Sequence, residues 1–316
     1  MTPARPHTPV PVATRPASMM AGGREFLWGP KTYVMAALNI TPDSFSGDGL
    51  LAGRVDRDQA APAALRARGA GGWVRAAVDW ALRSEDEGAD IIDIGGESTR
   101  PRSVYPDARP VSVGQELERV LPVISALKGR LSAPISVDTR KAEVARAAAR
   151  EGAALVNDVS MLGDTGMARA AAETGLPIVI SHTRARAEYV DVMADIIAGL
   201  SGAISRAEQA GVARERIIID PGIGFAKTAA HSLEAVRRLR ELRALGLPIL
   251  VGTSRKSFIG DVLDLPVSDR LEGTAATVAL AIANGADIVR VHDVRFMARV
   301  ARMSDAVVRG WQPGNG

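Results

Sequence analysis

The amino-acid sequence predicts an α/β protein, a (β/α)8 TIM barrel forming a single domain behind an N-terminal tail. Three observations lead to this fold. Eight short aliphatic runs recur along the 316 residues, stretches with helical spacing separate them, and each run ends in a polar residue. Continuous apolar runs separated by helices are typical of a parallel sheet covered by helices, and eight such units in roughly 250 residues match this barrel.

The first expected strand covers residues 33–40 and reads YVMAALNI. Each of the other seven follows a glycine of the kind that ends helices. These seven are residues 89–96, 130–138, 153–158, 176–182, 212–220, 247–254 and 286–293.

The clearest expected helix lies between the second and third strands. Its apolar positions are Leu117, Val120, Leu121, Ile124 and Leu127, at helical spacing. Ser112 and Gln115 form a capping box at its start. A doubly wound open sheet is the alternative, but neither G-x-G-x-x-G nor G-x-x-x-x-G-K-[ST] follows an expected strand.

Two segments carry no such pattern. Residues 1–24 are rich in Pro, Thr, Ala and Arg and contain no acid, so we expect a disordered tail before a barrel of residues 25–316. An organelle transit peptide is the alternative, although the prolines disfavour its amphipathic helix. Residues 51–72 lack sustained periodicity and are expected to form a long loop.

Composition narrows the function classes. The chain has no cysteine, which excludes disulfides, thiolate metal sites and cysteine nucleophiles, and is compatible with the cytoplasmic location that we expect. No apolar run reaches eighteen residues, so no membrane span is expected. A net charge of +3, carried by scattered arginines beside only 4% aromatic residues, disfavours a nucleic-acid partner.

Polar residues at the strand ends indicate where a site lies, because such barrels build their active sites at the C-terminal ends of the strands. Any one of them can be an ordinary cap or loop residue, but eight strand ends in succession indicate a function. The residues are Asn39, Asp93, Glu97, Asp138, Asn157, Asp158, His182, Asp220, Ser254, Arg255, Lys256, Arg290, His292 and Asp293.

Asp93 and Asp138 are flanked by apolar residues, so each carboxylate needs a partner. That partner is either a ligand rich in N–H donors or a buried lysine or arginine, for which Lys256 is a candidate. The polar residues divide into two chemical groups. The acceptors suit the edge of a heterocycle and are Asp93, Asp138, Asn157 and Asp220. The cationic group suits phosphate or carboxylate and comprises Arg100, Lys256, Arg290 and His292.

Seven motifs in sequence order closely resemble dihydropteroate synthase, the folate-pathway enzyme that joins a pterin to p-aminobenzoate. The resemblance covers about residues 33–308. The motifs are LNITPDSFSGDG, IIDIGGESTRP, ISVDTRKAEV, LVNDVS, IIIDPGIGFAK, ILVGTSRKSFIG and IVRVHDV.

The resemblance implies a barrel that binds 6-hydroxymethyl-7,8-dihydropterin diphosphate, p-aminobenzoate and Mg2+. The family's pterin positions fall on Asp93, Asp138, Asn157, Asp220 and Lys256. Its diphosphate positions fall on Asn39, Arg100, Arg290 and His292, and Asn39 also binds Mg2+, with Asp48 as a further candidate. Its p-aminobenzoate positions fall on Phe45, Thr99, Pro101, Lys256 and Ser257.

The resemblance further implies a reaction without a covalent enzyme nucleophile. Diphosphate leaves the pterin methylene, the arylamine attacks the resulting cation, and electrostatic stabilisation is the main contribution of the enzyme. The residues expected to act in catalysis are Asp93, Asp138, Lys256, Arg290 and His292. Family members are typically homodimers through the late helices, where Leu271, Val278, Ile282, Phe296 and Val300 are either interface or core.

Three departures from the family pattern concern loops. Asp48 is displaced by one place, residues 51–72 are an insertion, and the segment after His182 lacks the usual methionine-glycine-rich turn. Two alternatives therefore stay open: a pterin-dependent methyltransferase and a non-catalytic pterin-binding paralogue. The paired motifs GESTRP and SRKS disfavour the first, and retention of the cationic residues disfavours the second.

Overall fold

A computed structural model describes residues 16, 18–40, 72–97 and 111–311 of the chain. All eight expected strands are present and parallel to their neighbours. They are β3 (Tyr33–Asn39), β4 (Ile91–Gly95), β5 (Ile135–Asp138), β6 (Leu155–Asp158), β7 (Ile178–Ser181), β8 (Ile217–Asp220), β9 (Leu250–Val251) and β10 (Ile288–Val291).

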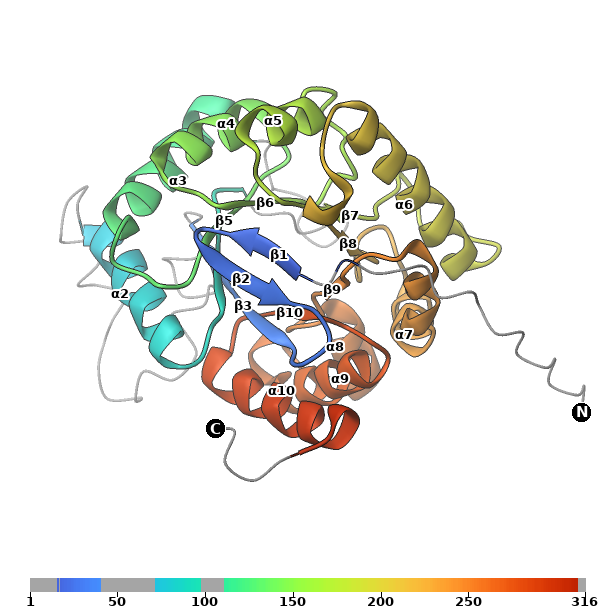
Figure 1. Ribbon diagram of the computed structural model, residues 1–316. Helices are drawn as coiled ribbons and strands as arrows, with labels where there is room; N and C mark the ends of the chain where they lie inside the picture. The colour runs from blue at the N-terminus through green and yellow to red at the C-terminus, as the bar shows by residue number, and fades with distance from the viewer. Residues whose placement is uncertain (1–15, 17, 41–71, 98–110, 312–316) are drawn as a thin grey trace, which may run out of the picture.

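The sheet closes into a barrel. Its strand order is β8-β7-β6-β5-β4-β3-β10-β9, and a single parallel bridge between Ile219 and Ile249 joins the two ends. The helices form a ring around it (Figure 1). They are α2 (Gly72–Asp86), α3 (Val113–Leu127), α4 (Ala142–Glu151), α5 (Met167–Thr174), α6 (Val192–Gln209), α7 (Ala229–Arg237), α8 (Ser257–Leu263), α9 (Leu271–Ala283) and α10 (Val294–Arg309). The predicted fold class is confirmed, and the doubly wound alternative is wrong.

Local sequence signals account for the helix ends. The Ser112–Gln115 capping box is present at the start of α3, with both reciprocal hydrogen bonds. Gly175 and Gly246 end their helices in the left-handed conformation, which glycine adopts without a steric penalty. The chain therefore reverses toward the next strand where the sequence predicts it.

Residues along each strand alternate between two apolar layers. Outward-facing residues such as Ile92 and Ile94 pack under the helices, whereas Ile91 belongs to a second cluster inside the barrel. Because side chains alternate along a strand, the next inward-facing residue lies two positions further on, nearer the C-terminal mouth. In β4 that position is Asp93 and in β8 it is Asp220. The barrel interior is therefore apolar toward the N-terminal ends of the strands and polar toward their C-terminal ends.

An antiparallel hairpin, β1 (Ser18–Ala21) and β2 (Arg24–Leu27), lies across the centre of the ring of helices (Figure 1). Its Phe26 is fully buried against the rings of Trp28 and Tyr33, at centroid distances of 6.2 and 4.8 Å. The expected disordered tail of residues 1–24 is therefore wrong for β1 and the start of β2, whereas residues 1–15 and 17 lie outside the described residues. Met19, Ala21 and Phe26 join the interior cluster, a contribution that proline content alone does not reveal.

Asp90, just before β4, ties the hairpin to the barrel. Its carboxylate accepts from Arg24 at 2.6 Å, Lys31 at 2.8 Å and the backbone N–H of Val34 at 2.9 Å. A buried carboxylate with three donors is well satisfied. The hairpin therefore has both apolar and ionic anchors at the N-terminal end of the barrel.

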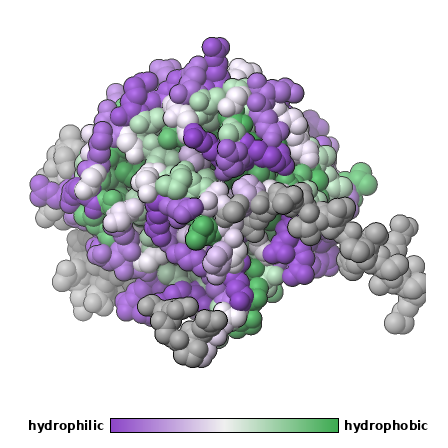
Figure 2. Space-filling view, in the orientation of Figure 1, coloured by the Kyte–Doolittle hydropathy of each residue, from purple (hydrophilic) through white to green (hydrophobic). Residues whose placement is uncertain are grey.

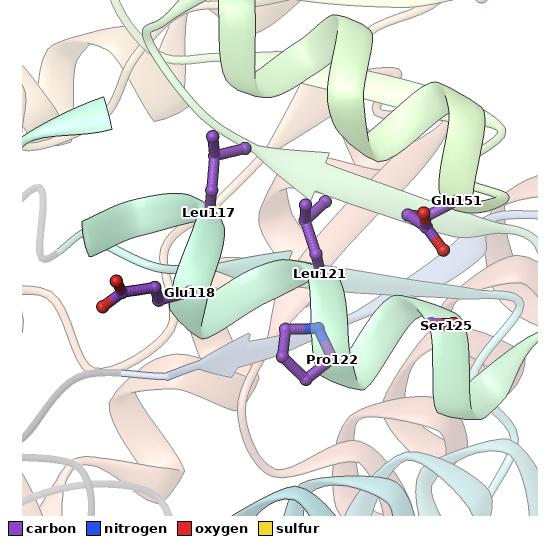
Figure 3. A pocket seen from close by; sticks show the side chains of 6 residues that line it. All are labelled: Leu117, Glu118, Leu121, Pro122, Ser125 and Glu151. Carbon is purple, nitrogen blue, oxygen red and sulfur yellow. The ribbon is translucent and has the colours of Figure 1, made fainter. Parts of the chain in front are cut away.

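The face of the molecule seen in Figure 2 is largely hydrophilic with scattered apolar patches. Among the described residues, no helix is both long and apolar enough to cross a bilayer. One pocket on the outside of the barrel has Leu117 and Leu121 of α3 on its wall, with Glu151 of α4 beside them (Figure 3). It lies between two outer helices and includes none of the residues at the strand ends.

Candidate active site

Arg290 joins the two buried aspartates at the C-terminal mouth. Its Nε lies 2.6 Å from Asp93 Oδ2, and its Nη2 lies 2.8 Å from Asp138 Oδ2. The partner of both carboxylates is thus an arginine, as one of the two alternatives predicted, but it is Arg290 rather than the candidate Lys256. Both aspartates are buried, and the side chain of Arg290 is 19% exposed.

Burial and charge act in opposite directions in this triad. Burial alone would lower the pKa of the Arg290 guanidinium, but Asp93 and Asp138 raise it above its ordinary value. For Asp138, burial raises the carboxyl pKa to about 7 and the neighbouring Asp93 adds to the rise, while Arg290 opposes it. The arginine stays charged, and the pKa of Asp138 is high enough for this carboxyl to take up a proton near neutral pH.

Three acceptor atoms in this cluster are buried without a hydrogen-bond partner among the described residues. They are Asp93 Oδ1, Asp138 Oδ1 and Asn157 Oδ1, while Asn157 Nδ2 donates to Asp93 Oδ2 at 3.0 Å. Buried acceptors are normally satisfied, so these atoms match a ligand that presents several N–H donors.

Asp220 is the fourth member of the predicted heterocycle group. It accepts from Ser181 Oγ at 2.9 Å and from the Gly222 backbone N–H at 2.8 Å, and burial raises its pKa. A Cβ atom at Gly222 would lie 1.9 Å from the carbonyl oxygen of His182, so only glycine fits there. The β8 loop is therefore packed directly on the end of β7.

Lys256 stands at the N-terminus of α8, with its Nζ 4.3 Å from the centroid of the Phe225 ring. Its neighbour Arg255 has a φ of +56° and forms a two-point ion pair with Asp293, at 2.6 and 2.9 Å. Arg270 donates to the carbonyl oxygens of both Arg255 and Lys256 at 3.2 Å. Neither Arg270 nor Phe225 was predicted, because partners on other elements leave no local spacing signal.

His292 and Glu97 are held by neighbours at the ends of their strands. His292 Nδ1 lies 3.0 Å from Ser254 Oγ, which places a second strand-end residue beside it.

Glu97 pairs with Arg140 at 2.8 Å and with Lys141 at 2.7 Å. Burial would raise the pKa of Glu97, but these two cations lower it. Lys141 also binds the buried Glu116 of α3, an ion pair that sequence reasoning missed.

Asn39 ends β3 beside the same cluster. A Cβ placed on Gly95 would lie 3.5 Å from both Asn39 Oδ1 and Asp138 Oδ2, so these oxygens flank one glycine. No group of three His, Asp or Glu side chains suited to a metal occurs among the described residues. Mg2+ in phosphate-transfer sites commonly takes one or two protein oxygens plus substrate oxygens and water, and the Asn39 amide oxygen fits such a role.

The structure brings together Asn39, Asp93, Asp138, Asn157, Asp220 and Arg290 inside the barrel mouth, with Lys256, Ser257 and His292 on the loops and helix start after β9 and β10. Five predicted site residues lie outside the described residues. They are Phe45, Asp48, Thr99, Arg100 and Pro101. The expected loop of residues 51–72 falls outside them as well, except for Gly72, which begins α2.

Tyr189 lies in the segment that follows β7. The Tyr189 hydroxyl donates to the Ala226 carbonyl at 3.0 Å, and its ring lies 4.8 Å from His231 and 6.3 Å from His182. Beneath it, His182 Nδ1 lies 3.0 Å from Lys227 Nζ. Burial, followed by the charges of Lys227 and Arg184, lowers the pKa of His182 to about 3.

We expect His182 to make the fold sensitive to acid. Its folded pKa lies below the unfolded value of 6.5, so its contribution to stability is complete above pH 6.5 and is lost as the pH falls toward about 3. The free energy of unfolding should decrease by up to about 1.4 kcal/mol per pH unit within that window. Urea titrations at several pH values test this, and His182→Asn should flatten the slope. An unchanged slope in that variant would assign the acid sensitivity elsewhere.

The fold and this polar mouth are those of a pterin-binding enzyme, and residues 68–292 match the family described as pterin binding enzyme. A dihydropteroate synthase of Clostridium beijerinckii is 44% identical over 92% of this chain and 100% of its own length. The chain therefore belongs to the dihydropteroate synthase family.

Solved structures agree with this family. The Xanthomonas albilineans dihydropteroate synthase with 4-aminobenzoic acid superposes with a TM-score of 0.79 at 38% identity, covering 92% of this chain and 98% of the other. The enzyme from the same organism in complex with 7,8-dihydropteroate gives a TM-score of 0.76 at 36% identity, with the same coverage. The resemblance drawn from the seven motifs is confirmed.

Proposed function

We propose that the barrel mouth condenses 6-hydroxymethyl-7,8-dihydropterin diphosphate with p-aminobenzoate, giving 7,8-dihydropteroate and diphosphate. One observation carries the assignment of the site: three buried acceptor atoms, one each on Asp93, Asp138 and Asn157, have no hydrogen-bond partner among the described residues. The pterin ring presents amino and ring N–H groups that match them. Asp220, buried on the neighbouring side, supplies a fourth acceptor.

The anionic part of the substrate belongs at the open side of this pocket. Among the described residues, Arg290 uses Nε and Nη2 for Asp93 and Asp138, which leaves its Nη1 group for an anion. His292 stands at the end of the same strand, β10. We assign the diphosphate to Arg290 and His292, because a guanidinium binds phosphate strongly and an imidazole N–H can donate to a phosphate oxygen.

Mg2+ would be held by Asn39 together with the diphosphate, and when bound it would neutralise charge on the leaving group. Asp48, the second predicted ligand, lies outside the described residues and stays a prediction. The same holds for the predicted contacts of Phe45, Thr99, Arg100 and Pro101. Calorimetric titration of Mg2+ with diphosphate into the wild type and into Asn39→Ala tests whether Asn39 binds Mg2+.

The residues of the mouth would act by charge complementarity. As the bond from the pterin methylene to diphosphate breaks, positive charge spreads into the ring beside the carboxylates of Asp93 and Asp138. Arg290 and His292 face the departing anion. The p-aminobenzoate nitrogen forms the new bond to the methylene and gives up a proton to water or to the departing diphosphate, with Lys256 and Ser257 proposed to orient the arylamine. Electrostatic preorganisation of this kind needs no covalent nucleophile.

Lys256→Ala should lower turnover by roughly 10²–10³-fold, since one fixed electrostatic contact to the reacting groups contributes about 2.7–4 kcal/mol. The assay incubates protein with the pterin diphosphate, p-aminobenzoate and Mg2+ and follows diphosphate release and product mass. Lys31→Met, at the opposite end of the barrel beside Asp90, is the control. Turnover within about threefold of the wild type would remove Lys256 from its proposed role.

The same assay separates the alternatives. A pterin-dependent methyltransferase would bind pterin without releasing diphosphate, and a non-catalytic paralogue would bind product without turnover. Formation of 7,8-dihydropteroate excludes both. The cytoplasmic location stays a prediction.

A homodimer through the late helices is also proposed. Of the residues predicted as interface or core, Val278 and Ile282 are core, each 1% exposed. Other side chains of α9 and α10 are open instead: Leu280 is 55%, Met303 65% and Val307 73% exposed. These supply apolar area for a second copy of the chain. Light scattering of the wild type and of Val307→Glu would test it, with a monomeric wild type as the contrary result.

A further inference from the structure

Several contacts join the ends of strands β7 and β8. The Ser181 hydroxyl donates to Asp220, and the His182 N–H donates to the Asp220 carbonyl at 2.9 Å. Gly222 lies against the His182 carbonyl with no room for a side chain. The end of β7 is therefore hydrogen-bonded and closely packed against the loop after β8.

Lys227 is the cation at this connection. Its Nζ lies 3.0 Å from His182 Nδ1, 3.2 Å from the Phe225 carbonyl oxygen and 3.5 Å from the His182 carbonyl oxygen. Because His182 stays neutral above about pH 3, its Nδ1 accepts from the ammonium when the ring proton is on Nε2. Nε2 in turn lies 3.4 Å from Asp195 of α6. Lys227 thus joins two strand ends through one side chain and two carbonyl groups.

Four charged residues from different parts of the chain affect the pKa of this ammonium. Burial lowers the pKa of Lys227 to about 7; Asp220 and Asp195 raise it, whereas Lys256 and Arg184 lower it further. The charges of Lys227 and Lys256 both lower the pKa of Asp220, so both ammonium groups act electrostatically on this carboxylate. Burying the Lys227 ammonium costs free energy. An apolar side chain of similar length would pack there without that cost, so packing alone does not account for a lysine at this position.

The backbone between Phe225 and Lys227 is strained. Ala226 has a φ of +44°, an unfavourable value for a residue with a Cβ, and its carbonyl accepts from Tyr189. Strained residues persist only where their surroundings hold them. The Phe225 ring, set by this turn, lies 4.3 Å from Lys256 Nζ.

We propose that Lys227 is a positioning residue for the pterin site, holding the β7 and β8 ends together and fixing Phe225 so that its ring supports the Lys256 ammonium. The proposal rests on the proposed function, which places the pterin beside Lys256 and Asp220. Lys227 acts through geometry: it orients the Phe225 ring, and the Phe225 ring in turn positions the Lys256 ammonium.

A double-mutant cycle tests the proposal. Calorimetry measures the affinity for pteroate of the wild type, Lys227→Met, Phe225→Leu and the double variant. Lys227→Met should weaken binding about tenfold, the loss expected when a charge-assisted hydrogen bond of about 1.5 kcal/mol is removed. In the Phe225→Leu background the same substitution should change affinity by less than about twofold, because interacting residues are non-additive.

Rescue and stability separate positioning from folding. Lys227→Arg, which keeps a cationic donor, should recover most of the affinity. Tyr189→Phe removes a hydrogen bond from the same turn and serves as a structural control, measured by melting temperature beside pteroate affinity. If Lys227→Met fails to fold, Lys227→Gln enters the same cycle, since its carboxamide retains a donor.

Equal losses in both backgrounds, or a lower melting temperature with unchanged affinity, would overturn the proposal. A wild type that does not bind pteroate would instead refute the proposed function, so the two failures are distinguishable. A loss of affinity that appears when Phe225 is present and disappears in Phe225→Leu would support the positioning role.

Discussion

Replacing Arg290 by methionine should lower the free energy of unfolding by about 3–5 kcal/mol, the penalty for removing one partner from a buried ion pair. Asp93 and Asp138 are the carboxylates left behind, and both are buried. Methionine keeps much of the side-chain length while removing every donor. Because the charge of Arg290 lowers the pKa of Asp138, removing Arg290 raises that pKa further above about 7. Chemical denaturation at several pH values from 8 upward therefore measures how the penalty grows as Asp138 ionises.

The double variant Arg290→Met/Asp93→Asn is the matched control. It removes one of the two abandoned charges and retains the Asn157 contact in a neutral form, so it should recover part of the lost stability. At lower pH the single variant should also regain stability, because Asp138 takes up a proton. If Arg290→Met were as stable as the wild type at pH 8, the triad would not be a structural ion pair.

Activity should fall as well, since the same guanidinium is proposed to face the diphosphate. Loss of one such donor typically lowers turnover by about 10²–10³-fold. Arg290→Lys separates the two effects: it keeps the positive charge but cannot reach Asp93 and Asp138 from two nitrogens of one plane. It should therefore be more stable than Arg290→Met and still strongly impaired in turnover.

The second large effect is expected at the opposite end of the barrel. Phe26→Ala should lower the free energy of unfolding by about 3–5 kcal/mol, because truncating a buried phenylalanine leaves a cavity. Phe26 is fully buried with Trp28 and Tyr33 under the barrel interior. The Michaelis constants of the folded protein should stay unchanged, since the N-terminal face of such barrels serves stability.

Leu27→Ala is the control for this prediction. Leu27 is the neighbouring hairpin residue, it is 49% exposed, and its loss should change stability by less than about 0.5 kcal/mol. Thermal and urea unfolding of both variants compare the two sides of one strand. A small effect of Phe26→Ala would mean that the hairpin does not contribute to the folded core.

The strands and their polar ends were predictable because period and position are local signals. Runs such as ILVG and IVRV mark buried strands, and the barrel rule then places Lys256 and Arg290 on one face. The pairing of Arg290 with Asp93 was not predictable, because the two residues are 197 positions apart and no spacing signal links them. The resemblance to known enzymes supplied ligand roles but likewise no internal partner.

The hairpin was missed for a different physical reason. Two strands of four residues carry too little periodicity to stand out from a proline-rich segment, and their stability comes from the barrel interior that they cover. The connection between Lys227 and His182 was missed because a lysine in a loop normally faces solvent. In both cases tertiary contacts, rather than local propensity, decide the structure.

The closure of the barrel is uneven, and this has a mechanical consequence. β9 has two residues, and one bridge between Ile219 and Ile249 joins β8 to its neighbour, whereas β3 and β4 pair over five positions. Sheet pairing is weakest where the fewest hydrogen bonds hold it. That seam separates the strand bearing Asp220 from the loop bearing Lys256. A small widening there would change the distance between these two proposed pterin contacts while the other strands keep their register. We therefore expect the most easily deformed side of the barrel to be the side where the pterin is proposed to bind.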